Sequence, residues 1–93
     1  MRSKLIEDIS RHGVTILLFL LTQEKVIVSD ARRLNIGYST FYRSLIPLIK
    51  MGLIEEEAEG ARKAFKLTEL GRQVALKLKE IDDMLKTSVK QEV

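Results

Sequence analysis

A basic stretch without acidic residues contains the side chains that could bind a charged partner. From Ala31 to Lys50 the chain has no Asp or Glu but four cationic side chains, Arg32, Arg33, Arg43 and Lys50. A helix beginning at about Ser39 would place five residues on one side at about 100° per residue: Ser39, Thr40, Arg43, Pro47 and Lys50. Hydroxyls and cations donate hydrogen bonds to phosphates and base edges, so this face suits a nucleic-acid groove. The same pattern also fits an ordinary amphipathic helix with a solvated outer face.

Residue types that support catalysis or metal binding are sparse. The chain has no cysteine, which excludes disulfides and cysteine-ligated metals. Its single histidine, His12, has no companion ligands at metal-site spacing. Neither a phosphate-binding glycine loop nor a nucleophile–base pair is recognisable. We therefore expect no enzyme, no metal site and no cofactor.

Length and charge describe one small folded domain. The 93 residues are 45% hydrophobic and 31% charged, as in soluble globular proteins. The net charge of +3 is a weak sign of an anionic partner, and an acidic run, Glu55, Glu56, Glu57 and Glu59, follows the basic stretch. The longest apolar run, Val14 to Leu21, is shorter than the roughly 20 residues of a membrane span. It also lies too deep in the chain for a signal peptide, so we expect a cytoplasmic protein.

Hydrophobic spacing in the first half predicts three helices and a short strand. Residues 3–23 read as a helix, with either a break at 11–13 or close packing at Gly13. The β-branched run 26–28 is too short to stand alone and requires a partner sheet. Ser29 is a suitable N-cap for a helix over 30–34, and Asn35 and Gly37 supply a turn, in which Gly37 is free to adopt positive φ. In the next helix, which begins at about Ser39, the inward face is formed by Phe41, Leu45, Leu48 and Ile49.

The second half predicts a hairpin and a long final helix. Gly52 ends the preceding helix, and strands over 53–57 and 64–67 would be joined by a loop over 58–63. Thr68 is a suitable N-cap for a helix extending to about Val89. Spacings of 4, 3, 4 and then 3 or 4 connect Val74, Leu78, Ile81, Leu85 and either Ser88 or Val89. This is the seam of a coiled coil, although its first part also fits packing on its own domain.

Two segments carry a resemblance to a known family. LNIGYSTFYRSLIPLIKMGLI from Leu34 and FKLTELG from Phe65 resemble the winged helix-turn-helix domain of MarR-type and related archaeal transcriptional regulators. The matching pieces are Thr40-Phe41 leading to Leu45 and Leu48, the helix exit at 52–54, and the return over 67–71. The resemblance covers roughly residues 12–75. It implies a mainly α fold with a small β-hairpin (α+β), with a winged helix-turn-helix over 1–70 and a coiled-coil dimerisation helix over 68–93.

The resemblance also implies how DNA would be bound. The recognition helix, about 39–50, would lie in the major groove, and the wing, about 58–63, near the minor groove. The recognition helix would contact DNA through Ser39, Thr40, Tyr42, Arg43 and Lys50. Backbone and wing contacts would come from Arg32, Arg33, Arg62 and Lys63. A homodimer with antiparallel C-terminal helices would use Val74, Leu78, Ile81, Leu85 and Val89.

Two departures from the family pattern and two alternative functions remain open. Pro47 lies inside the recognition helix, where we expect a bend or an early helix end. The acidic run at the base of the wing would repel the phosphates of DNA.

The leading hypothesis is a sequence-specific double-stranded DNA-binding regulator that acts as a nucleoid-associated homodimer. The alternatives are a sequence-tolerant architectural DNA-binding protein and a winged-helix module that binds protein.

Overall fold

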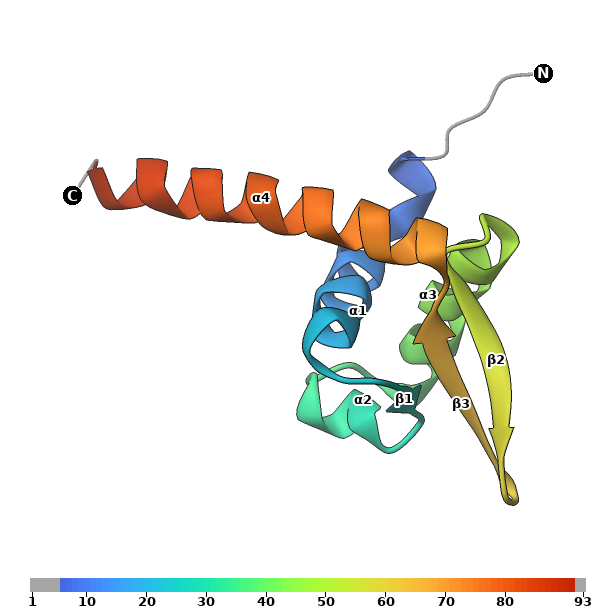
Figure 1. Cartoon of the computed structure of the whole chain (residues 1–93). Helices are drawn as coiled ribbons and strands as arrows, with labels where there is room; N and C mark the ends of the chain where they lie inside the picture. Colours follow the sequence, from blue (N-terminus) through green and yellow to red (C-terminus); the bar gives the residue numbers. More distant parts are fainter. Residues whose placement is uncertain (1–5, 92–93) are drawn as a thin grey trace.

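A computed structural model describes residues 6–91, and their elements follow the predicted order (Figure 1). A short 3₁₀ helix, η1 (Glu7–Ile9), leads into α1 (Ser10–Thr22), followed by β1 (Val26–Ile27), α2 (Asp30–Arg33) and α3 (Tyr38–Lys50). The strands β2 (Ile54–Glu59) and β3 (Arg62–Leu67) form a hairpin, and α4 (Glu69–Gln91) closes the chain. The fold class predicted from the sequence is confirmed: a mainly helical chain with a small antiparallel sheet.

The first helical segment breaks at Ser10, next to the predicted range. Ser10 has φ 63° and ψ 164°, a conformation that side-chain-bearing residues rarely adopt. Its hydroxyl accepts a hydrogen bond from the Gly13 N–H at 3.1 Å, which caps the new helix. Gly13 is buried, and a Cβ built there would lie 3.3 Å from Ile9 Cγ2 and 3.5 Å from Leu48 Cδ2. Both the break and the close packing are therefore present.

The three strands pair in the order β1-β3-β2. The short β1 finds the partner that its length requires, because Val26 pairs with Phe65 and Ile27 with Ala64. The predicted loop over 58–63 is wrong: both strands continue to the pair Glu59–Arg62, which leaves only Gly60 and Ala61 in the turn. Gly60 has φ +64°, the positive value that a two-residue hairpin loop beginning with glycine requires.

The core lies between α1, α3, the sheet and the first turns of α4. Its largest fully buried side chains are Phe41, Ile16, Leu17, Leu45, Leu48, Ile54 and Val26. The inward face predicted for α3 is correct except at its last residue. Ile49 is 40% exposed, because the core contacts of α3 end with Leu48.

The end of α3 and the start of α4 meet at one backbone junction. Gly52 adopts φ +76° after the last turn of α3, and the next amide, Leu53 N–H, donates to Leu48 O at 2.9 Å. The Thr68 hydroxyl donates to the Gly52 carbonyl and accepts from the Gly71 N–H, while the Thr68 N–H donates to Leu53 O at 3.0 Å. A Cβ built on Gly71 would lie only 1.8 Å from Leu53 O. No side chain larger than hydrogen fits at position 71 without movement of the backbone.

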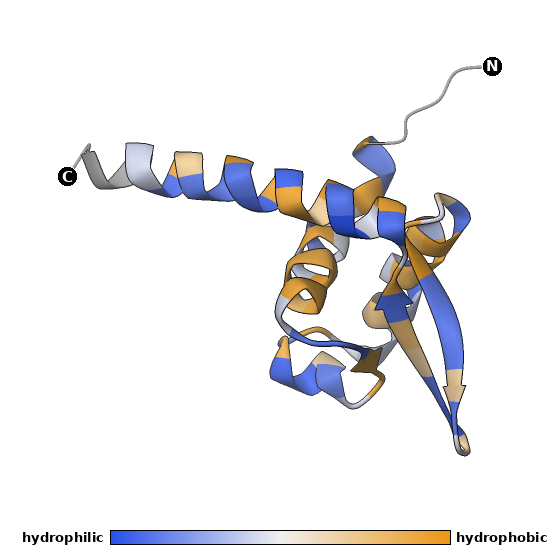
Figure 2. Ribbon diagram, viewed as in Figure 1, coloured by the Kyte–Doolittle hydropathy of each residue, from blue (hydrophilic) through white to orange (hydrophobic). Residues whose placement is uncertain are grey.

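The second half of α4 projects away from the domain (Figure 1). Ala75 is buried, and Val74 and Leu78 are partly buried against the core. Beyond Leu78, apolar residues alternate with charged ones along an exposed helix (Figure 2). Within residues 6–91 no helix is both long enough and apolar enough to cross a membrane.

The junction generates a stability prediction. Gly71→Ala places a methyl group against the Leu53 carbonyl and should lower the free energy of unfolding by about 1–3 kcal/mol or more, since α4 must move away from β2. Urea denaturation monitored by circular dichroism measures the change. Gly37→Ala is the control, because a Cβ there meets nothing within 4 Å, and it should cost less than about 1 kcal/mol. Equal losses for the two variants would contradict the role assigned to the junction.

Candidate nucleic-acid interface

A tight turn between α2 and α3 sets the angle of the predicted recognition helix. The Ile36 N–H donates to Ala31 O at 2.9 Å, and both side chains are buried. Asn35, rather than Gly37, takes the positive φ of this turn, at 62°. Gly37 instead has φ −64° and ψ 152° and is the N-cap of α3, so the turn does not use the positive φ that is open to glycine there. Two short helices joined in this way form a helix-turn-helix unit.

The predicted recognition residues all lie on α3, and Lys50 lies apart from the other four, at the far end of the helix. Ser39, Tyr42 and Arg43 are exposed, and Thr40 is half-buried. α3 continues through Pro47 to Lys50, so the proline does not end the helix early. Lys50, at the far end of the helix, lines a separate groove together with Pro47.

An exposed apolar row on α3 was missed by the sequence analysis. Tyr38, Tyr42, Ile46 and Ile49 are 40–52% exposed and follow one another at spacings of 4, 4 and 3. These spacings make a second helical stripe, and their regularity was the signal available in the sequence. The Tyr42 ring meets the buried Phe41 ring edge-on, with centroids 6.2 Å apart. The exposed face of α3 thus combines hydroxyl and cationic groups with large apolar surface.

The two arginines of α2 have different surroundings. Arg33 Nη1 lies 3.2 Å from Asp30 Oδ1, and its guanidinium lies 5.8 Å from the centre of the Phe19 ring. Asp30 is itself fixed, because its Oδ2 accepts a hydrogen bond from the Ile27 N–H at 2.9 Å. Arg32 is exposed beside a hollow of about 280 Å³ that the α2–α3 turn and Tyr38 also line. Of the two arginines, Arg32 is the one placed at the turn between the helices.

The wing cations and the start of α3 surround one hollow. This hollow, the wing hollow, has a volume of about 660 Å³ and is lined by Ile27, Val28, Ser29, Tyr38, Tyr42, Ala61, Arg62 and Lys63. Arg62 and Lys63 come from β3, and the tyrosines come from the first turns of α3. The structure therefore brings together Tyr42, from the predicted recognition helix, and Arg62 and Lys63, from the predicted wing, and places Tyr38 and Ser29 beside them.

The acidic run of β2 is paired with lysines across the sheet. Because side chains alternate along a strand, Glu55, Glu57 and Glu59 lie on one face of the hairpin and Glu56 on the other. On the first face, Lys66 Nζ lies 3.2 Å from Glu57 and 3.8 Å from Glu55, and Lys25 Nζ lies 3.6 Å from both Glu57 and Glu59. Lys63 Nζ is 3.8 Å from Glu56 on the second face. The largely hydrophilic β2 of Figure 2 is thus a strand whose exposed carboxylates are each within 4 Å of a lysine.

Glu57 is the centre of this ion-pair network. The hydrogen bond from Lys66 and the positive charges of Lys25 and Lys66 hold the pKa of the Glu57 carboxyl below its ordinary value. The same contact raises the pKa of the Lys66 ammonium. Both shifts favour the charged forms, so the pair is intact at neutral pH.

Helix-turn-helix, three-stranded sheet and hairpin wing together define a winged-helix fold. Among the solved structures similar to it are the adhesin competence repressor AdcR of Streptococcus pyogenes (21% identity, TM-score 0.77) and the MarR family transcriptional regulator SPO1453 of Silicibacter pomeroyi DSS-3 (21% identity, TM-score 0.75). F-93 of SSV1 is also similar, with 28% identity and a TM-score of 0.68. The structural neighbours are thus winged-helix transcriptional regulators that include MarR-family members, and the resemblance predicted from the sequence is confirmed.

The neighbours differ in length. The matches cover 88%, 86% and 84% of this chain for AdcR, SPO1453 and F-93, respectively. They span 63% of the AdcR chain and 59% of the SPO1453 chain, but 88% of F-93. Neither a protein-family model nor a curated protein matches the sequence.

The ion-pair network predicts a pH-dependent stability. The folded pKa of Glu57 lies below the unfolded value, so its contribution is present above the unfolded pKa and is lost as pH falls through the folded pKa. Glu57→Gln should therefore destabilise the protein at neutral pH, and the deficit should shrink at low pH as the folded-state carboxyl is protonated, as measured by urea unfolding at each pH. Glu80→Gln, on the exposed part of α4, is the control and should be neutral at both. A deficit of Glu57→Gln that is unchanged at low pH would assign the effect to packing instead of charge.

Proposed function

We propose that this protein is a double-stranded DNA-binding transcriptional regulator whose α3 enters the major groove and whose wing lies against the adjacent backbone and minor groove. The observation that supports this most is the wing hollow, where the exposed start of α3 faces Arg62 and Lys63. The ion pairs of β2 weaken the main objection, because each of its four carboxylates is paired with a lysine and three of the four lie on one face of the hairpin. The winged-helix regulators among the structural neighbours support the same function.

The exposed residues of α3 divide into three roles. Arg43 reads a guanine by donating to O6 and N7, the commonest specific contact in the major groove. Ser39 and Thr40 donate to phosphate or to a base edge. The apolar parts of Tyr38 and Tyr42 pack on thymine methyl groups, which are the apolar feature of that groove. Lys50, distant from the wing hollow, contributes long-range attraction or a flanking phosphate contact.

Cations outside α3 position the protein on the duplex. Arg62 and Lys63 bind the phosphates of the strand that passes between α3 and the wing, and Arg32 binds a phosphate at the α2–α3 turn. Arg33 is the weakest of the predicted contacts, because its pair with Asp30 at 3.2 Å is closer than the pair of Lys63 with Glu56 at 3.8 Å. No cofactor or metal takes part in this scheme, and the protein acts in the cytoplasm on the nucleoid.

The regulator acts as a homodimer through the exposed half of α4. Ile81 and Leu85 of the predicted seam are 51% and 61% exposed, which leaves them available to a second copy. Val74 and Leu78 are shared with the core, and the side chain of Val89 lies outside the described part of the chain. A two-fold dimer would place two α3 helices in successive major grooves, with half-site centres about 34–36 Å apart.

One observation favours a second candidate function. The apolar row on α3 is also the kind of surface that binds protein, so a winged-helix protein-interaction module is the alternative. Measuring binding to a random and to a selected duplex separates these candidates. A protein-interaction module would bind neither duplex, a sequence-tolerant architectural protein would bind both equally, and a specific regulator would prefer the selected one.

Salt dependence tests the phosphate contacts. Three cations per copy, Arg32, Arg62 and Lys63, predict a slope of log K against log salt of about −5 for a dimer. Fluorescence anisotropy with a random duplex of about 30 base pairs, between about 50 and 200 mM salt, measures it. Arg62→Ala should make the slope less steep by about 2, whereas the charge-matched Lys79→Ala on α4 should leave it unchanged. Absence of binding even at low salt would favour the protein-interaction module.

Arg43 tests base reading. Once a preferred sequence has been selected, Arg43→Ala should weaken binding to it by about 1–3 kcal/mol and relax preference at one base position. Binding to random DNA should change much less. Arg72→Ala, which removes the same charge from α4, is the matched control. Equal weakening of specific and random binding by Arg43→Ala would make Arg43 a phosphate contact.

A further inference from the structure

Ile46 is a large apolar side chain on the exposed face of the recognition helix. At 100° per residue it lies about 20° from Ser39 and about 60° from Arg43 around the axis of α3. The buried Phe41 lies about 140° away, on the side that faces the core. Ile46 is 50% exposed, and the DNA contacts proposed for α3 do not include it. Its place between Ser39 and Tyr42 nevertheless puts it on the same surface as those contacts.

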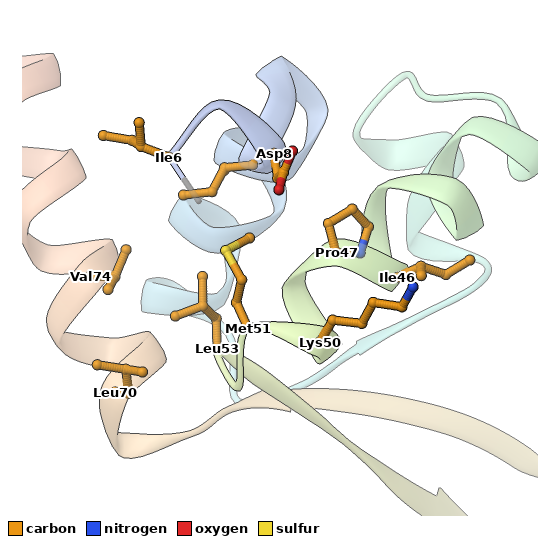
Figure 3. Close-up of a pocket in the computed structure, with 10 residues that line it drawn as sticks. Ile6, Asp8, Ile46, Pro47, Lys50, Met51, Leu53, Leu70 and Val74 are labelled. Carbon is orange, nitrogen blue, oxygen red and sulfur yellow. The ribbon is translucent and has the colours of Figure 1, made fainter. Parts of the chain in front are cut away.

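An apolar groove lies on one side of Ile46. The groove has a volume of about 820 Å³; its lining includes Ile46, Pro47 and Lys50 from α3, and Leu70 and Val74 from α4 (Figure 3). We call it the α3–α4 groove. In Figure 3, Ile46 lies at the outer edge of this groove, across from Leu70 and Val74. Because Ile46 remains half exposed there, the groove does not account for its apolar surface.

The charges around Ile46 restrict the kind of partner that can cover it. α3 contains no acidic residue, and Arg43 and Lys50 lie three residues before and four residues after Ile46, where helix side chains are neighbours. The wing hollow adds the cations Arg62 and Lys63. An apolar partner would bury these cations without a counter-charge, which is costly. The partner must therefore combine negative charge with a small apolar contact.

The major groove of DNA has this combination. Phosphates border the groove, and the apolar group on its base edges is the C5-methyl group of thymine. At 1.5 Å per residue, Ile46 lies about 10 Å from Ser39 along α3, within the groove width of about 12 Å. Lys50 lies about 16 Å from Ser39 and so reaches beyond the bases, to the level of the flanking phosphates. Of these two residues, Ile46 is the one placed over base edges.

We infer that Ile46 is a specificity-determining residue that packs on the C5-methyl group of a thymine in the target duplex. This inference rests on the proposed function and adds a base that the target must contain. Tyr42, one turn earlier in the same exposed row, packs on a neighbouring thymine. Arg43 precedes Ile46 by about 4.5 Å along the helix axis. The guanine read by Arg43 therefore lies within about two base pairs of the thymine read by Ile46, at about 3.4 Å per base pair.

Replacement of thymine by uracil in the DNA tests this contact. Deoxyuridine pairs with adenine as thymidine does but lacks the methyl group, so only the proposed contact is lost. Each thymine of the selected duplex is replaced in turn, and fluorescence anisotropy measures binding. One replacement, within two base pairs of the guanine, should weaken binding about fourfold through Ile46, the effect of burying one methyl group. Replacements outside the half-site should have no effect.

Variants at position 46 assign the lost contact to Ile46. Ile46→Ala should weaken binding to the selected duplex, leave binding to random duplex unchanged, and abolish the uracil effect at that one thymine. Ile46→Val, which is one methylene smaller, should retain most of the effect. Leu76→Ala is the matched control, because Leu76 is 49% exposed but lies on α4, and the full uracil effect should remain. Circular dichroism confirms that each variant is folded.

The outcomes separate this inference from the proposed function. If uracil has no effect at any thymine, the protein binds DNA without reading methyl groups, so the inference is wrong and the proposed function stands. If Ile46→Ala retains every uracil effect of the wild type, other residues read the methyl groups and the role of Ile46 is refuted. If the protein binds neither the random nor the selected duplex, the proposed function fails and the inference fails with it.

Discussion

The contact between Gly71 and the Leu53 carbonyl is the constraint on which the arrangement of this molecule depends. It allows α4 to start directly against the residues that end α3, with Thr68 hydrogen-bonded to the backbone of both segments. A longer side chain at position 71 would push α4 away from the Leu53 backbone, which follows α3. Apart from the short Thr68 side chain, the junction is made of backbone groups, so the direction of α4 relative to the end of α3 does not depend on long flexible side chains. Any contact that orients α4 therefore also acts on the end of α3.

Charge pairing has a comparable role in the wing. The hairpin extends beyond the core, so β2 has no apolar alternation after Ile54 to hold it in register. Its carboxylates instead meet Lys25, Lys63 and Lys66 across the sheet. Each exposed ion pair contributes little to stability alone. Together, however, the pairs connect β2 both to β3 and to the segment before β1. The same pairs leave Arg62, which makes no such contact among the described residues, as the least neutralised cation of the wing.

The sequence predicted the elements well because their signals are local. Caps, glycines and periodic apolar residues placed each helix and strand to within a few residues, and the winged-helix resemblance gave their arrangement. Failures had two causes. The strands are longer than predicted for a local reason, because Gly60 takes the positive φ of a two-residue turn and pairing continues to Glu59 and Arg62. The exposure of Ile49 depends instead on contacts distant in sequence, which decide where the core ends. For the candidate site, the sequence named Tyr42, Arg62 and Lys63 as DNA contacts on two separate elements, and the fold places all three around the wing hollow together with Tyr38 and Ser29. Lys50 lies elsewhere, beside Pro47.

The recognition helix is the element where these observations meet. One side of α3, with Phe41 and Leu45, is buried in the core, and another, from Ser39 to Arg43, is exposed beside the wing. A third part, at Ile46 and Pro47, lines the α3–α4 groove. A partner seated in that groove would contact the back of the helix that the proposed function places in the major groove. Because α3 is already fixed by the core on its buried side, such a contact would act on the position of the whole helix and not on its folding.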